Sequence, residues 1–330
     1  MLGGVSEHQN ACVVTSSRCP TGGCSQPGTE GPNPTLIVVL LLLERARVDE
    51  YFFHMDPSST NRIPKHVEIL YRDGITALKG AFSPQWVEQC REDMLTAFWE
   101  AIQRPGGAVG RGPRRWYVET HPQAFRGFSE LTTHPWVVGM CQAVLGEQYE
   151  IVEIGFDVPF QGAKYQPWHR DFPSPPESHR DRKITSLAFN VTGVDVTPDM
   201  GPLEIAIGTQ WEEGHGWKHK MFPPESLWPR YASLGVRKYP QAGDVSCRSA
   251  LTIHRGTEHP SPIARPVLVL GVDAPGAGHA ALHDVMVTRE YYDSMPQSLR
   301  EHLVCRVVET LTPIVQKHDI EGLVLEGKPY

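Results

Sequence analysis

The chain has 330 residues, 40% of them hydrophobic, and a formal net charge of −7, which suffices to bury a core in one large domain or at most two. The mild acidity argues against a nucleic-acid-binding protein, because such a protein needs a basic face for the phosphates. The 30 glycines and 29 prolines argue against a helical bundle and favour short strands joined by turns.

Residues 1–60 are predicted to form a disordered or poorly structured extension, since "VTSSRCPTGGCSQPGTEGPNP" is rich in Gly, Ser, Thr and Pro. The apolar run at 36–43 is too short to cross a bilayer, which takes about 20 residues, and its flanks do not fit a secretory signal. The seven cysteines include no CxxC pair, which is typical of free thiols in a reducing compartment. We therefore expect a cytoplasmic protein without a membrane span.

Ordered structure is expected to begin near Ile63. In "SPQWVEQCREDMLTAFWEAIQR", Ser83 is the expected N-cap and Pro84 the first helical residue. A second helix, "PWVVGMCQAVLG", is expected to stop at Gly146. The basic, glycine-rich segment between them, "RPGGAVGRGPRRWY", is predicted to be a loop. A last helix is predicted near the C-terminus from apolar residues at helical spacing, namely Leu299, Leu303, Val307 and Leu311.

From Glu150 the apolar residues alternate with a period of two, which indicates strands. The expected strands are "EIVEIGFDVPF", "ITSLAFNVTGVDV", "GPLEIAIGTQW", "GDVSCRSALTIH" and "ARPVLVLGVDA". Asn190 interrupts the second of these, and its side chain either reaches the interior or faces solvent. Helices followed by a run of strands, without βαβ alternation, predict one mainly β domain over residues 61–330 with flanking helices, folded as a jelly-roll or barrel.

The tripeptide His-Arg-Asp occurs twice, at 169–171 and at 179–181. Side chains at i and i+2 of an extended segment leave on the same face, so each copy presents an imidazole and a carboxylate together. With one distant histidine, such a pair makes the 2-His-1-carboxylate set that suits non-heme Fe(II). A kinase catalytic loop is excluded, because neither copy has an asparagine five residues after its aspartate.

A second segment, "GDVSCRSALTIHRGTEHPSPIARPVLVLGV", supplies the distant histidine. His254 ends an apolar stretch, and Arg265 follows 11 positions later at the start of the next strand. A guanidinium there can bind a carboxylate bidentately. His-x-Asp, a distal histidine and an arginine at this spacing are together far more specific than any of these features alone.

With these motifs, residues from about 60 to 330 resemble the phytanoyl-CoA dioxygenase family of Fe(II)/2-oxoglutarate oxygenases. The matching pieces are "YQPWHRDF", "VTPDMGPLEIAIGTQW" and "GDVSCRSALTIHRGTEHPSPIARPVL". The resemblance implies a cupin-like double-stranded β-helix in which His169, Asp171 and His254 hold the iron. It also implies that Arg265 binds the far carboxylate of 2-oxoglutarate, with Thr257 as a further candidate contact.

The resemblance further implies the reaction. Such an enzyme uses Fe(II), 2-oxoglutarate and O₂, hydroxylates a small molecule and releases succinate and CO₂. Asp171 favours oxygen transfer over halogenation, since related halogenases carry a small residue at the equivalent position. Many relatives have an asparagine where this chain has His259, which leaves polar contacts in that turn open.

The first copy of the tripeptide is the preferred one. His169 lies between Trp168 and Phe172, apolar neighbours that suit a dry pocket, whereas residues 177–183 are mostly charged and resemble a solvated loop. The segment 164–166 before the motif holds candidate substrate contacts.

The sequence does not identify the substrate, although an acyl-CoA and a secondary metabolite are candidates. Arg111, Arg114 and Arg115 would suit an anionic substrate, but a solvated basic loop is the commoner reason for such a run. Two other functions fit the residues: a noncatalytic binding protein with the same fold, and a metal hydrolase with the same His/Asp/His set. The oligomeric state stays open.

Overall fold

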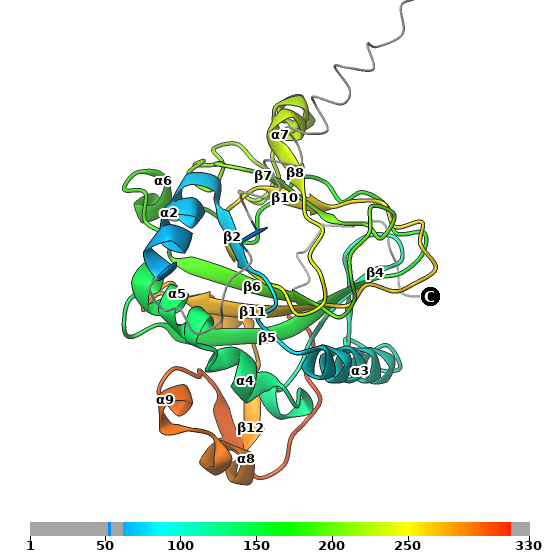
Figure 1. Cartoon of the computed structure of the whole chain (residues 1–330), viewed down its shortest axis with the longest axis vertical. Helices are drawn as coiled ribbons and strands as arrows, with labels where there is room; N and C mark the ends of the chain where they lie inside the picture. Colours follow the sequence, from blue (N-terminus) through cyan, green and yellow to red (C-terminus); the bar gives the residue numbers. More distant parts are fainter. Residues whose placement is uncertain (1–51, 54–61, 318–330) are drawn as a thin grey trace, which may run out of the picture. The chain divides into compact units, whose positions relative to one another are not determined.

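An eight-stranded sheet faces a three-stranded sheet (Figure 1). Residues of both sheets line one cavity. This computed structural model describes residues 52–53 and 62–317, all of which fall within one compact unit. The predicted extension over residues 1–60 therefore lies outside the described residues, apart from Phe52–Phe53. The two facing sheets agree with the predicted mainly β domain.

The strands of each sheet come from distant parts of the chain, as in a jelly-roll. In spatial order the large sheet contains β1 (Phe52–Phe53), β2 (Ile75–Leu78), β9 (Val245–Ser249), β6 (Ser186–Thr192), β11 (Val267–Asp273), β5 (Glu150–Pro159), β4 (Arg115–Glu119) and β3 (Val109–Gly110). The small sheet contains β10 (His254–Gly256), β7 (Leu203–Ala206) and β8 (Gly235–Arg237). Strands β12 (Met286–Thr288) and β13 (Arg306–Val308) pair separately.

Helices cover the outer face of the large sheet (Figure 1). The helices of the described residues are α2 (Ile63–Asp73), α3 (Pro84–Ala101), α4 (Phe128–Thr132), α5 (Pro135–Leu145), α6 (Pro176–His179), α7 (Trp228–Leu234), α8 (Arg289–Ser294) and α9 (Gln297–Arg300). Of these, α7 packs against β7 of the small sheet and α8 against β12, not on the large sheet. Helix α3 begins as predicted, with the Ser83 side chain accepting a hydrogen bond from the Trp86 amide. Helix α5 ends before Gly146, also as predicted.

The two faces of the large sheet have different environments. On β6, Phe189 and Val191 belong to the hydrophobic core under the helices, where Phe189 packs edge-on against Trp136 of α5. The intervening residues Asn190 and Thr192 line the cavity. On β6 the large apolar side chains thus stabilise the outer layer, while Asn190 and Thr192 bring polar groups to the cavity.

The predicted C-terminal helix is wrong beyond α9. Residues 306–308 form β13, which pairs in parallel with β12, and Leu303 bridges to Ile151 of β5. Valine favours strands, and pairing partners from distant segments outweigh the helical spacing of four apolar residues.

Two further boundaries differ from the prediction. The glycine-rich loop contains β3 and β4, and β4 pairs antiparallel with β5. The segment "GDVSCRSALTIH" is two strands, because the chain turns after Ser249 and crosses from the large sheet to the small one. His254 consequently begins a strand, β10, and does not end one.

The four cysteines within residues 62–317 are free, as predicted; they are Cys90, Cys141, Cys247 and Cys305. Across the same described residues, every helix is either too short or too polar to traverse a lipid bilayer.

We expect His66 to make the fold sensitive to mild acid. Its Nδ1 lies 2.8 Å from the Thr76 hydroxyl, and the buried ring packs edge-on against Trp136. Burial and the charge of Arg62 lower the pKa of His66 from 6.5 to about 4. The unfolded chain therefore takes up this proton first, and the free energy of unfolding should fall by up to about 3 kcal/mol as the pH drops from about 6.5 to 4.

Denaturant unfolding of the wild type and of His66→Gln at pH 7.5 and pH 5 checks this expectation. The variant should lose less stability between the two pH values than the wild type does. Equal losses would show that another group dominates the acid response.

Candidate metal centre

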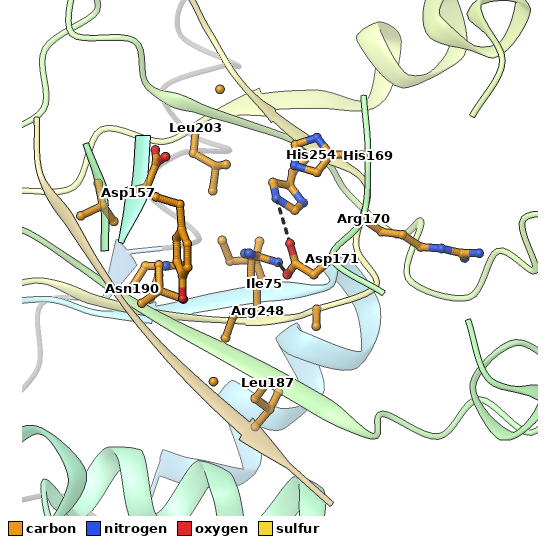
Figure 2. A pocket seen from close by; sticks show the side chains of 18 of the residues that line it. Ile75, Asp157, His169, Arg170, Asp171, Leu187, Asn190, Leu203, Arg248 and His254 are labelled. Carbon is orange, nitrogen blue, oxygen red and sulfur yellow. Dashed lines mark hydrogen bonds and ion pairs between the residues drawn. The ribbon is translucent and has the colours of Figure 1, made fainter. Parts of the chain in front are cut away.

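Three candidate ligands converge on the cavity, which has a volume of about 240 Å³. The ligating atoms of His169, Asp171 and His254 all lie within 4.8 Å of one another, and His254 Nε2 is 3.6 Å from Asp171 Oδ1. Figure 2 shows the three side chains together on one side of the cavity. Two imidazole nitrogens and one carboxylate oxygen can occupy one face of a metal ion and leave the opposite positions open.

Backbone hydrogen bonds hold the three residues together. His169 and His254 exchange amide-to-carbonyl bonds of 3.0 and 2.8 Å, and the Asp171 amide donates to the Ala250 carbonyl over 3.0 Å. The tripeptide therefore pairs like a short strand with the start of β10. This pairing sets the spacing of the ligands before any metal binds.

Both imidazole rings are oriented by a backbone carbonyl. His169 Nδ1 lies 2.8 Å from the Pro167 carbonyl, and His254 Nδ1 lies 2.9 Å from the Thr252 carbonyl. A carbonyl only accepts, so Nδ1 carries the proton in each ring and the Nε2 lone pair is free for a metal. Burial lowers the pKa of His169, and it lowers that of His254 further. Both rings are therefore neutral at neutral pH, as metal ligation requires.

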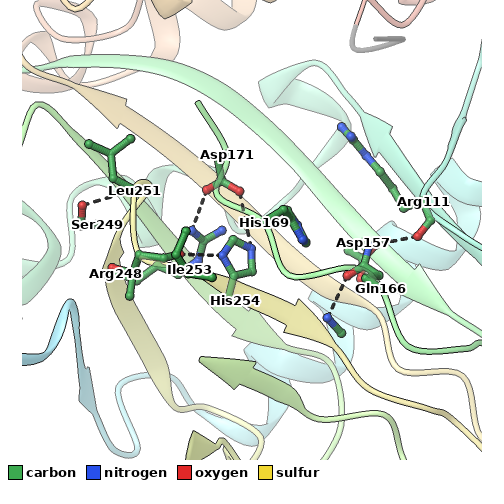
Figure 3. A network of polar contacts seen from close by, with 12 residues as sticks. Arg111, Asp157, Gln166, His169, Asp171, Arg248, Ser249, Leu251, Ile253 and His254 are labelled. Carbon is green, nitrogen blue, oxygen red and sulfur yellow. Dashed lines mark hydrogen bonds and ion pairs between the residues drawn. The ribbon is translucent and has the colours of Figure 1, made fainter. Parts of the chain in front are cut away.

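The carboxylate of Asp171 is held by Arg248. The guanidinium Nη1 of Arg248 lies 2.6 Å from Asp171 Oδ2, which leaves Oδ1 toward His254 (Figure 3). Burial raises the pKa of Asp171, but the positive charge of Arg248 and its hydrogen bond outweigh burial and lower it to about 2. Asp171 is thus ionised at neutral pH.

The middle residue of the tripeptide points away from the metal centre, as the period of two predicts. The guanidinium of Arg170 donates to the backbone carbonyls of Glu212, Glu213 and Lys220 and lies over the Trp217 ring. Figure 2 shows this side chain leaving on the opposite side from its two neighbours. Its role is to anchor the segment 212–220 to the metal motif.

The second copy of the tripeptide does not reach the cavity. His179 ends the short helix α6, and Asp181 is about half exposed and pairs with its neighbour Arg180. Among residues 52–53 and 62–317, the one group of His, Cys, Asp and Glu side chains placed to hold a metal is the set built on the first copy.

Arg265 also lines the cavity. It is 5% exposed, and its Nε and Nη2 donate to the carbonyls of Met200 and Gly201 at 2.8 and 2.9 Å. Burial, together with the nearby charge of Arg115, lowers the pKa of Arg265 to about 10, so the guanidinium is still charged at neutral pH. Nη1 makes no hydrogen bond within the described residues and remains available to a ligand.

A second buried guanidinium, that of Arg115, lies at the same end of the cavity. Arg115 pairs with Asp157 over 3.1 Å and donates to the Thr257 carbonyl. It passes so close to β10 that a Cβ at Gly256 would lie 2.2 Å from its Nη1, so a side chain there would have to displace the buried guanidinium. Arg115, Asp157 and Arg265 together leave one net positive charge, which suits one carboxylate.

The other predicted residues fall in different places. The Thr257 hydroxyl donates to the Pro202 carbonyl, and Thr257 is not among the residues that line the cavity. His259 is buried and its Nε2 bonds the Ile263 carbonyl, so it closes the turn before Arg265.

The basic run of β3 and β4 is divided by the fold. Arg111 and Arg115 line the cavity, whereas Arg114 is exposed and bonds the Gln161 carbonyl. Of the segment before the motif, Gln166 lines the cavity, and its side chain bridges the Gly256 amide and the Arg111 carbonyl.

Sequence reasoning missed Arg248 and Asp157. Both lie on strands in which the apolar residues face the helices and the residues between them face the cavity. A charged residue at such an intervening position was the available signal for a cavity-lining side chain. In "GDVSCRSA" the residues Asp244, Ser246, Arg248 and Ala250 all line the cavity. Of the two apolar neighbours of His169, Phe172 lines the cavity, whereas Trp168 is fully buried in a separate cluster with Tyr231 and Ile253.

Two comparisons with known proteins gave matches. A family model described as phytanoyl-CoA dioxygenase (PhyH) matches residues 70–267, more than half of the chain. The solved structure "Crystal structure of EctD from S. alaskensis with bound Fe" is similar with a TM-score of 0.50 and 17% sequence identity, over 67% of this chain and 79% of that one. At this identity the likeness concerns the fold, and it confirms the predicted double-stranded β-helix. No curated protein matches the sequence.

Proposed function

Because the chain belongs to the phytanoyl-CoA dioxygenase family, we propose that it is an Fe(II)- and 2-oxoglutarate-dependent dioxygenase that hydroxylates a small molecule. The observation that carries the proposal is the cavity itself. It brings two neutral imidazoles and one ionised carboxylate together, and it is lined further along by the buried guanidinium of Arg265.

His169, Asp171 and His254 would hold the iron. The two nitrogens and one oxygen suit Fe(II), and the backbone carbonyls behind both rings direct Nε2 to a common point. When bound, ferrous iron would couple the decarboxylation of 2-oxoglutarate by O₂ to hydroxylation of a C–H bond, with succinate and CO₂ as the other products.

The residues of the chain would bind and orient the cosubstrate. Arg265, with its Nη1 free, would hold the far carboxylate of 2-oxoglutarate, and Arg115 would supply a second positive charge there. Thr257 would act only through its carbonyl, which positions Arg115. Apolar side chains such as Leu203 and Val267 also line the cavity and would limit water around the reacting groups.

The two alternative functions are less well supported by this cavity. A metal hydrolase needs a metal-bound water but no buried arginines for a dicarboxylate. A noncatalytic binding protein needs neither the ionised Asp171 nor the oriented imidazole rings. The complete set of groups therefore favours the dioxygenase.

Metal removal tests the proposal. The full chain, supplied with 2-oxoglutarate and O₂, is expected to form succinate only with iron, so a chelator should abolish succinate formation and added Fe(II) should restore it. Zn²⁺ should not restore it. Hydrolysis of a substrate with Zn²⁺ and without 2-oxoglutarate would select the hydrolase. Failure to bind iron would select the noncatalytic binding protein.

A further inference from the structure

We propose that the substrate carries a carboxylate and that Arg248 binds it beside the metal ligand Asp171. This inference rests on the function proposed above and names the class of substrate that the same cavity selects. It assigns the recognition of the anion to a strand residue inside the cavity and not to the basic run at Arg111, Arg114 and Arg115.

Arg248 is a buried cation with unused hydrogen-bond donors. Its side chain is 8% exposed and lines the cavity, and Nη1 forms an ion pair with Asp171. Within the described residues Nε is buried without a partner, and Nη2 makes no hydrogen bond. Leaving donors of a buried charged group unpaired is costly, so an acceptor from a ligand is expected there.

The sheet leaves room for a ligand next to this guanidinium. In the large sheet Arg248 of β9 lies opposite Ala188 of β6, which in turn lies opposite Gly271 of β11. A Cβ at Gly271 would lie 2.5 Å from Oε2 and 2.8 Å from Cβ of Glu153 on β5, so the Glu153 side chain covers this glycine. The room beside Arg248 therefore lies over its cross-strand neighbour Ala188, a small residue that also lines the cavity.

This position is separate from the proposed 2-oxoglutarate end. Gly271 of β11 belongs to the cross-strand row of Arg248. Val267, which follows Arg265 by two residues, lies on the same strand four residues before Gly271. Four residues of a strand span about 13 Å. A cosubstrate held by Arg265 and the metal would therefore leave the unused donors of Arg248 to a second molecule.

The charges around the cavity favour an anion with a single charge. Glu153 accepts a hydrogen bond from the Tyr117 hydroxyl. Asp273 accepts one from the Ser186 hydroxyl. Both carboxylates line the cavity and would repel a dianion. Since Arg248 already shares its charge with a metal ligand, a carboxylate fits better than a phosphate.

Binding of matched acid and amide probes tests the inference. The full chain is loaded anaerobically with Fe(II) and saturating 2-oxoglutarate, which occupies the Arg265 end, and is then titrated by calorimetry with benzoate, benzamide, hexanoate, hexanamide and inorganic phosphate. We expect each carboxylate to bind the wild type about 10- to 100-fold more tightly than its amide. Phosphate should bind more weakly than the carboxylates.

Two variants identify the residue responsible. Arg248→Gln keeps a donor for Asp171 but removes the charge, so its acid-to-amide preference should fall to about 1 while iron still binds, as a separate iron titration would show. Arg111→Gln removes another guanidinium that lines the cavity, one that lies over the Tyr117 ring, and should keep the preference.

Several results would overturn the inference. These are no measurable carboxylate binding to the loaded wild type, equal binding of acid and amide, tighter binding of phosphate, or a preference lost in Arg111→Gln but kept in Arg248→Gln. A wild type that binds no iron would overturn the proposed function as well, so the two failures can be told apart.

Discussion

Alanine in place of either His169 or Asp171 is expected to lower iron-dependent succinate formation by more than about 100-fold. Loss of a residue that only orients a metal ligand typically costs 10- to 100-fold in metal affinity or activity, and loss of a ligand should cost more. Asp171→Ala would also leave the buried guanidinium of Arg248 without its carboxylate. The measurements are succinate formation and bound iron in the purified variants.

The second tripeptide provides the matched control. His179→Ala and Asp181→Ala change the same residue types in the same sequence context, but their side chains lie at the end of α6 and on the surface, outside the metal cluster. Both variants should keep nearly normal activity. The reverse pattern, with activity lost only in the second copy, would contradict the assignment of the metal centre.

Removal of the guanidinium in Arg265→Met is expected to raise the KM for 2-oxoglutarate by roughly 30- to 1000-fold. Truncating one partner of a buried, hydrogen-bonded charge pair costs about 2 to 4 kcal/mol, and each 1.4 kcal/mol is tenfold. Arg265→Lys keeps the charge but loses the planar fork, so its KM should lie between those of the wild type and Arg265→Met. Initial rates of succinate formation over a range of 2-oxoglutarate concentrations measure this.

Arg114→Met is the control for this prediction, because Arg114 is exposed and its side chain bonds the Gln161 carbonyl on the surface. Arg265 also donates hydrogen bonds to the Met200 and Gly201 carbonyls, so replacing it can destabilise the fold. Thermal unfolding of each variant therefore separates a loss of binding from a loss of fold. A folded Arg265→Met with an unchanged KM would contradict the role proposed for Arg265.

Local patterns predicted much of the fold. The alternation in residues 150–160 corresponds to β5, and Ser83 and Gly146 bound helices α3 and α5 as predicted. These features depend on neighbours in sequence, through strand period, caps and turns, and so they can be recognised without tertiary contacts.

The cavity face was harder to predict. Polar residues in an alternating strand usually face solvent, yet Arg248 and Asn190 point into the interior because the second sheet covers that face. Burial of a charged side chain depends on which strand lies opposite. The glycine at 271 and the alanine at 188 acquire their importance in the same way, from cross-strand neighbours.

The residue types and the two-residue period by themselves determined that each His-Arg-Asp tripeptide presents an imidazole and a carboxylate together, and that the arginine between them points elsewhere. Only the tertiary structure decided which copy meets His254, because the backbone of His169 pairs with that of His254 while the second copy lies at the end of a surface helix. A metal centre requires donor atoms within a few ångströms, and contacts between distant segments are set by strand pairing and burial, which no local period encodes.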